Sequence, residues 1–130
     1  MNYFRAFIAG TVLPTIVLPI LLCTAITYGK PQLLGITFIH MIPVIWGIWN
    51  LLYFAICKNF LPGSLTVRYF LTGGSLGLLI AIYGIFWQKV PAALGFEEYQ
   101  YYPLVLAPIV YAILWRYVVK PLNDLLCVKE

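Results

Sequence analysis

The chain has 130 residues, of which 63% are hydrophobic and only 9% are charged, and its mean hydropathy is +0.95. A typical soluble domain is about 25% charged, so this composition excludes an ordinary water-soluble fold. The net charge of +4 does not indicate nucleic-acid binding, because the positive residues stand singly at the ends of apolar runs and form no basic cluster.

Four uncharged, mostly apolar runs follow one another, at residues 6–29, 31–57, 69–88 and 99–115. A helix needs roughly 20 apolar residues to cross a bilayer, and these runs lack the alternating pattern of barrel strands. The sequence therefore predicts an all-α, four-helix transmembrane bundle with up-down-up-down topology, in a single domain over residues 1–130. The expected spans are at about 6–28, 33–57, 67–88 and 100–119.

The basic residues predict the orientation of these spans. If the N-terminus is cytoplasmic, Lys30 and Lys89 lie outside, and all other basic residues lie inside: Arg5, Lys58, Arg68, Arg116, Lys120 and Lys129. The positive-inside rule then places both termini in the cytoplasm. Small size and short loops favour a bacterial inner membrane.

The first predicted span contains Pro14 and Pro19, each of which removes a backbone donor and is expected to bend the helix. Bent helices can line a cavity, but prolines are common in membrane spans, so a structural role is the simpler interpretation. The run is too long for a secretory signal and has no small-x-small cleavage site before Tyr28, so it is expected to stay as a span.

The second predicted span contains the only histidine, His40, and a mid-span asparagine, Asn50. At 1.5 Å per residue the two lie about 15 Å apart along one helix, so each needs its own partner. A three-four spacing predicts one inward face, with Pro43 and Asn50 beside it: Thr37, His40, Val44, Gly47, Leu51 and Phe54. Candidate ligand-binding residues are Thr37, His40, Pro43 and Asn50.

The third predicted span carries small residues at intervals of four and three: Gly73, Gly77, Ala81 and Gly84. Such a seam lets helix backbones come together in a solvent that provides no hydrophobic driving force. Packing within the bundle and pairing of two copies both fit this seam.

The remaining polar residues are interpreted as surface groups. Glu97 and Glu98 are adjacent in the longest outer loop and would diverge on a helix, although a cation or a basic partner could use them. Arg116 is expected to anchor the end of the fourth span, and residues 121–130 to form a short polar tail.

Little in the sequence specifies chemistry. No acidic residue lies inside a predicted span, which argues against ion-driven transport. The single histidine gives no catalytic set, no metal site and no resident cofactor, since two haem-ligating histidines would require a dimer.

The favoured hypothesis is a non-enzymatic membrane protein that works by helix packing, as a subunit, scaffold or assembly factor. Its partners would be the lipid bilayer and either a second copy or another membrane protein, with no nucleic acid. The alternative is a channel or carrier for a small neutral or lipid-like solute, with a site around His40 and Asn50. An enzyme that uses His40 is the least favoured hypothesis.

Overall fold

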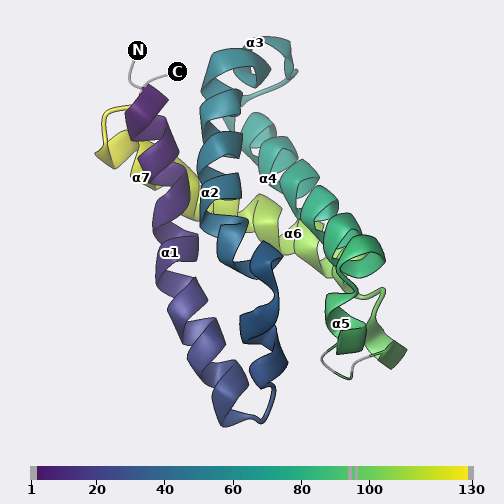
Figure 1. The fold of residues 1–130 in the computed structure, drawn as a ribbon. Helices are drawn as coiled ribbons and strands as arrows, with labels where there is room; N and C mark the ends of the chain where they lie inside the picture. The colour runs from purple at the N-terminus through teal and green to yellow at the C-terminus, as the bar shows by residue number, and fades with distance from the viewer. Residues whose placement is uncertain (1–2, 94, 96, 129–130) are drawn as a thin grey trace.

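The computed structural model describes residues 3–93, 95 and 97–128, and this part of the chain is entirely helical in its regular structure (Figure 1). It contains four helices that are long and apolar enough to cross a membrane: Tyr3–Thr27, Thr37–Ile56, Leu65–Trp87 and Pro103–Leu125. The predicted all-helical fold with four long apolar helices is thereby confirmed.

These helices are built from shorter elements. The α-helices are α1 (Tyr3–Thr27), α2 (Thr37–Leu52), α3 (Lys58–Phe60), α4 (Leu65–Ile82), α5 (Val90–Ala93), α6 (Pro103–Leu114) and α7 (Lys120–Leu125). Short 3-10 turns are η1 (Pro31–Gly35) and η4 (Glu97–Tyr99), and wider π turns are η2 (Tyr53–Cys57), η3 (Tyr83–Trp87) and η5 (Trp115–Val119).

The first helix hairpin consists of α1 and α2, which are in direct contact. Gly29 makes the turn between them at a φ of +74°, a conformation that favours glycine. Gly10 allows the two backbones to approach, because a Cβ added there would lie 2.6 Å from the carbonyl oxygen of Trp46. Close packing of this hairpin therefore depends on a glycine of α1 facing α2.

The second hairpin consists of α4 and α6, which also pack directly together. The Ser64 side chain caps the start of α4 by accepting a hydrogen bond from the Val67 backbone N–H at 3.4 Å. Gly77 gives the backbone of α6 its space, since a Cβ added there would lie 2.5 Å from the Ala107 carbonyl oxygen.

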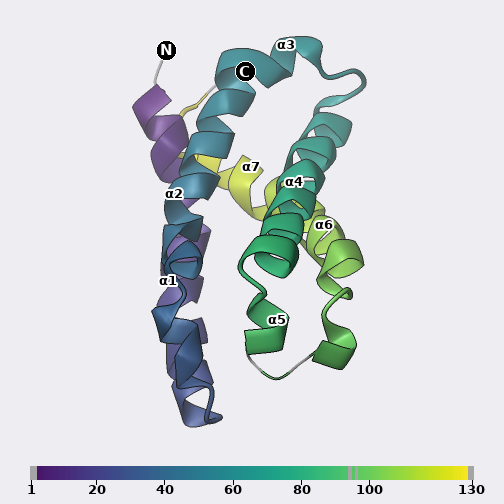
Figure 2. The same cartoon turned by 45° about the vertical axis from the view of Figure 1, so that its right-hand side comes forward.

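The two hairpins lie side by side (Figure 2). Helix α1 packs against η5 and α7, whereas α2 and α4 are linked through side chains. One link is a hydrogen bond from the Trp49 indole N–H to the Thr72 carbonyl, at 2.9 Å. Another is a pair of rings, Phe38 and Tyr83, whose centroids are 4.7 Å apart. The backbones of α2 and α4 are not in close contact, unlike the backbones within each hairpin.

The hydrophobic core lies at the end of the molecule where α1 begins and α7 packs against it, here called the core end. Trp115 and Tyr53 are fully buried there, and the Trp115 ring lies 4.9 Å from that of Trp46. Tyr69 lies 4.9 Å from Tyr53. The opposite end carries η1 and α5 and is called the tip end (Figure 1).

The fourth helix corrects one expectation. The span was predicted to end at Val119, before a short polar tail, but the helix continues through η5 into α7 and ends at Leu125. Pro121 does not stop it, because it follows directly on the π turn η5, where the regular hydrogen-bond pattern is already changed and the lost backbone donor is accommodated. Asn123 is consequently carried into the core.

The second long helix also differs from the prediction, in the face that it buries. Thr37, His40 and Val44 were expected to face inward, but all three are exposed. Gly47 and Phe54 of the predicted face are buried, as is Asn50 beside it, and the other buried residues of this helix and the following turn are Ile39, Trp46 and Tyr53. The rings of the other helices decide this rotation, because Trp46 and Tyr53 pack against aromatic partners on the second hairpin.

Candidate functional site

The most buried polar group of the described chain is a cluster of two asparagines, Asn50 and Asn123, which we call the asparagine clamp. Both are 0% exposed. The Asn50 amide donates to the Asn123 side-chain oxygen at 2.8 Å, and the Asn123 amide donates back to the Asn50 oxygen at 3.3 Å. The clamp therefore ties α2 of the first hairpin to α7, the last helix of the chain.

Two further hydrogen bonds complete the clamp. Asn50 also donates to the Ala6 carbonyl oxygen of α1 at 2.6 Å, and Asn123 donates to the Tyr69 hydroxyl of α4 at 3.1 Å. The hydrogen bonds of these two side-chain amides therefore connect four helices, α1, α2, α4 and α7. Because the amide N–H groups of both asparagines are engaged and neither side chain is accessible, the clamp is a structural junction and offers no surface to a ligand.

Sequence reasoning proposed Asn50 as a ligand-binding residue and did not single out Asn123. The signal that could have found Asn123 is weak: it is an uncharged polar residue between Leu122 and Asp124, two positions after Pro121. The assumption that residues 121–130 form a polar tail concealed it.

His40 is exposed, and its ring makes a local contact. Its Nε2 lies 2.9 Å from the Leu34 carbonyl oxygen in η1, which requires the tautomer with the proton on Nε2. The histidine thus satisfies a carbonyl just before the start of α2. It shares no partner with Asn50, so the structure does not bring these two predicted site residues together.

Replacing His40 with alanine is therefore expected to have a small effect, about 0.5–1.5 kcal/mol of stability, the usual value of one hydrogen bond. His40→Gln can still donate to the Leu34 carbonyl and is expected to recover part of this loss. The measurement is unfolding in mixed detergent micelles followed by circular dichroism. A loss above about 3 kcal/mol would contradict this local role.

A groove with a volume of about 780 Å³ lies between α2 and α4, and we call it the α2–α4 groove. It is lined by Gly35, Ile36, Thr37, Phe38, Met41, Ile45, Trp49, Leu76, Leu79, Ile80, Tyr83 and Gln88. Of the predicted ligand-binding residues, Thr37 lines this groove, whereas His40, Pro43 and Asn50 do not.

The groove changes in character along its length. Its floor is formed by aliphatic side chains such as Ile45, Leu76 and Ile80, and Trp49 lies at its end toward the core. Toward the tip end it is lined by Thr37 and Gln88, and the Gln88 amide donates to the Tyr83 hydroxyl at 3.0 Å. None of the lining residues that the structure describes is charged.

A second, smaller cavity of 170 Å³ lies between α1, α2 and α6. Pro14 lines it together with apolar side chains such as Leu18 and Ile42, and Trp46 forms part of its wall. Pro14 therefore borders a cavity with an almost entirely apolar lining, and Pro19 borders another, of about 380 Å³, at the surface of α1.

The predicted helix-packing residues divide between two neighbours. Gly73 and Gly77 face α6: a Cβ added to Gly73 would lie 2.5 Å from the Trp115 Cβ and would also meet the Tyr111 carbonyl oxygen. Gly84 is buried against α2, 3.7 Å from the Phe38 ring by the same measure, and Ala81 is buried. All four positions of the seam are therefore buried within the chain.

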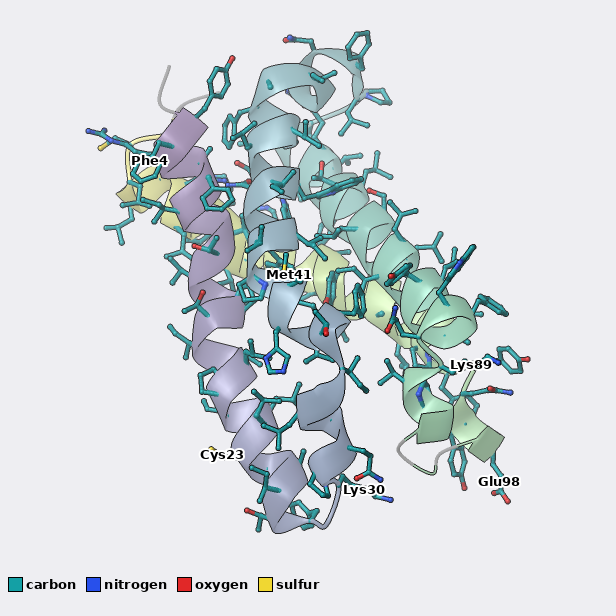
Figure 3. All side chains as sticks on the ribbon, in the orientation of Figure 1. Phe4, Cys23, Lys30, Met41, Lys89 and Glu98 are labelled. Atoms are coloured by element: carbon teal, nitrogen blue, oxygen red, sulfur yellow. The ribbon has the colours of Figure 1, made fainter. Side chains whose placement is uncertain are left out.

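The charged residues lie toward the ends of the molecule. Arg116 donates from Nε to the Thr66 hydroxyl at 3.1 Å, and its guanidinium lies 5.4 Å from the centre of the Tyr117 ring. Glu98 is exposed and lies at the tip end with Lys30 and Lys89 (Figure 3), whereas the side chain of Glu97 lies outside the description.

Comparison with protein-family models, curated proteins and solved structures finds no match to this chain. Among the described residues, no three side chains of the metal-binding types gather at one place.

Proposed function

We propose that this chain is a small polytopic membrane protein that acts by helix packing, as a subunit, scaffold or assembly factor of a membrane complex. In this proposal the four long helices cross the bilayer in up-down-up-down order. The core end, with Arg5, Arg68, Arg116 and Lys120, faces the cytoplasm according to the positive-inside rule. A bacterial inner membrane is the proposed location.

The observation that carries this proposal is the incomplete contact between the two hairpins. Within each hairpin, glycines bring the backbones together, whereas α2 and α4 lack close backbone packing and are linked through side chains such as Trp49 and Phe38. The four long helices share one buried core at the core end, but the two hairpins are less closely packed toward the tip end. A partner helix that packs on the outer faces of the hairpins would stabilise this arrangement, which supports a role in helix packing.

The apolar surface of α6 gives further support. This helix has no buried residue, and its side chains Val105, Ile109 and Ile113 are each about half exposed or more. Lipid can cover such a surface, and so can another membrane helix, because neither contact exposes polar groups.

The proposal is tested by photocrosslinking in the native membrane, with a photoreactive residue placed at Ile109 on α6 or at Ile20 on α1, both exposed. A packing subunit is expected to give one discrete protein adduct from one of these faces, with the same partner in repeated experiments. Light scattering in mild detergent then gives the stoichiometry. A strictly monomeric chain that forms only lipid adducts from both positions would overturn the proposal.

A second candidate function is binding or carriage of a neutral, lipid-like solute. The specific observation that favours it is the α2–α4 groove, which combines an apolar floor with uncharged polar groups at one end. The supported site is thus the groove with Thr37, rather than the surroundings of His40 and Asn50, which are engaged elsewhere.

A further inference from the structure

We propose that the α2–α4 groove binds a single-chain acyl lipid with an uncharged, hydroxyl-bearing head, of the monoacylglycerol class. The chain would lie along the aliphatic floor, and the head would lie at the tip end beside Thr37 and Gln88. This inference rests on the second candidate function and is independent of whether the chain also packs against a partner protein.

The dimensions of the groove fit one acyl chain. From Thr37 to Trp49 the lining stretch of α2 extends about 18 Å at 1.5 Å per residue. One leaflet of hydrocarbon is about 15 Å deep, which is half of the roughly 30 Å apolar core of a bilayer. A chain lying in the groove therefore extends from the level of the head groups to the middle of the bilayer.

The cross-section of the groove is large enough for an acyl chain and too small for a protein helix. A volume of 780 Å³ over about 18 Å gives a mean cross-section of about 40 Å². A helix with its side chains is about 10–12 Å wide, which corresponds to about 80–110 Å². A helix would have to separate α2 from α4, which the Trp49–Thr72 hydrogen bond and the contact between Phe38 and Tyr83 hold together.

The polar end of the groove indicates the head group. The Thr37 hydroxyl has no hydrogen-bond partner within the described residues, and Gln88 uses its amide N–H toward Tyr83 while its side-chain oxygen remains an acceptor. These groups can donate to and accept from hydroxyls. Among the described residues, the lining includes no charged side chain to pair with a phosphate or a carboxylate, so a neutral head is the best match.

The test uses the full chain, purified in detergent, and a monoacylglycerol with a photoreactive diazirine in its acyl chain. Mass spectrometry locates the labelled residues, and unlabelled monoacylglycerol competes for the site. We expect labelling at groove residues such as Met41, Ile45 and Ile80, and its loss on competition. Labelling spread evenly over the exposed faces of all helices would overturn the proposal.

A matched pair of variants on α2 makes the test specific. Met41 lines the groove, Ile48 does not, and both side chains are 46% exposed. Met41→Trp fills the groove and is expected to reduce groove labelling at least about tenfold, whereas Ile48→Trp leaves it unchanged. Circular dichroism confirms that both variants are folded. Equal labelling of the two variants would contradict binding in the groove.

The head-group assignment has its own measurement. Thr37→Val keeps the shape and removes the hydroxyl, so it is expected to weaken competition by monoacylglycerol about 2- to 10-fold, the value of one lost hydrogen bond. Competition by the corresponding acyl methyl ester is expected to be unaffected. A free fatty acid that competes better than monoacylglycerol would overturn the neutral head.

The outcomes for the two proposed functions are distinguishable. A purified monomer that binds monoacylglycerol in the groove supports the present inference even if no partner protein is found in membranes. A partner helix that crosslinks to Met41 and is not displaced by monoacylglycerol would overturn the inference and leave the packing function standing.

Discussion

Replacing Asn123 with leucine is expected to destabilise the folded protein by about 2–4 kcal/mol. The leucine removes three hydrogen bonds, two with Asn50 and one with Tyr69, and leaves the side-chain oxygen of Asn50 buried among apolar groups. A buried polar atom that loses its partner costs about 1–3 kcal/mol, and the packing of α7 is weakened as well. Unfolding in mixed detergent micelles, followed by circular dichroism, measures the loss.

The matched control for this prediction is Asn59→Leu, the same substitution at an exposed asparagine in α3. It is expected to change stability by less than about 0.5 kcal/mol, as surface substitutions usually do. If Asn123→Leu and Asn59→Leu were equally mild, the asparagine clamp would not hold the helices together.

The double variant Asn50→Leu/Asn123→Leu measures the interaction between the two asparagines apart from their contacts with other residues. In each single variant the remaining asparagine is buried without its partner, whereas in the double variant both asparagines are gone. The double variant is therefore expected to lose at least about 1 kcal/mol less stability than the sum of the two single variants. Measured coupling between polar side chains in membrane proteins averages about 0.6 kcal/mol and reaches about 1.7, so a reciprocal, fully buried pair is expected near the upper end. Strict additivity would mean that the two asparagines act independently.

Replacing Gly73 with alanine is expected to destabilise the second hairpin by about 1–3 kcal/mol, the usual cost of overpacking. The added methyl group would meet the Tyr111 carbonyl and the Trp115 Cβ, so α4 and α6 must separate. Alanine also favours a helix by about 1 kcal/mol relative to glycine, which reduces the net loss. The same unfolding measurement in micelles records the effect.

The adjacent glycine is the control. A Cβ added to Gly74 would lie 3.6 Å from the Pro108 carbonyl oxygen and 3.7 Å from the Ala112 Cβ, which are ordinary contacts. Gly74→Ala is therefore expected to be neutral or to stabilise the protein by up to about 1 kcal/mol through helix propensity. Effects of the same sign and size at Gly73 and Gly74 would contradict close backbone packing at this seam.

The general fold could be predicted because apolar runs of this length allow few solutions. A backbone in hydrocarbon must satisfy its own hydrogen bonds, so such runs form helices, and the glycine spacing of residues 73–84 indicates close packing. Which helix covers the seam could not be predicted. Gly73 and Gly77 face α6, whereas Gly84 faces Phe38 of α2, because the π turn that begins at Tyr83 changes the direction of the following residues.

The hydrogen-bond partners of the polar residues could not be predicted from the sequence. His40 and Asn50 were correctly expected to have separate partners, since helix geometry keeps them about 15 Å apart. The identity of those partners is a tertiary property: one is a carbonyl of the preceding turn, and the other is an asparagine 73 residues away. No local pattern encodes a contact over that separation.

Composition and the lengths of the apolar runs thus determine by themselves that four long apolar helices form, because only helices of that length satisfy the backbone in an apolar solvent. Tertiary structure alone decides that α7 enters the core, that Asn123 meets Asn50, and that a groove stays open between α2 and α4. The physical reason is that these helices are apolar over most of their surface, so hydrophobicity does not select one face, and rotation and neighbours are set by small residues, ring contacts and buried amides spread over distant parts of the chain.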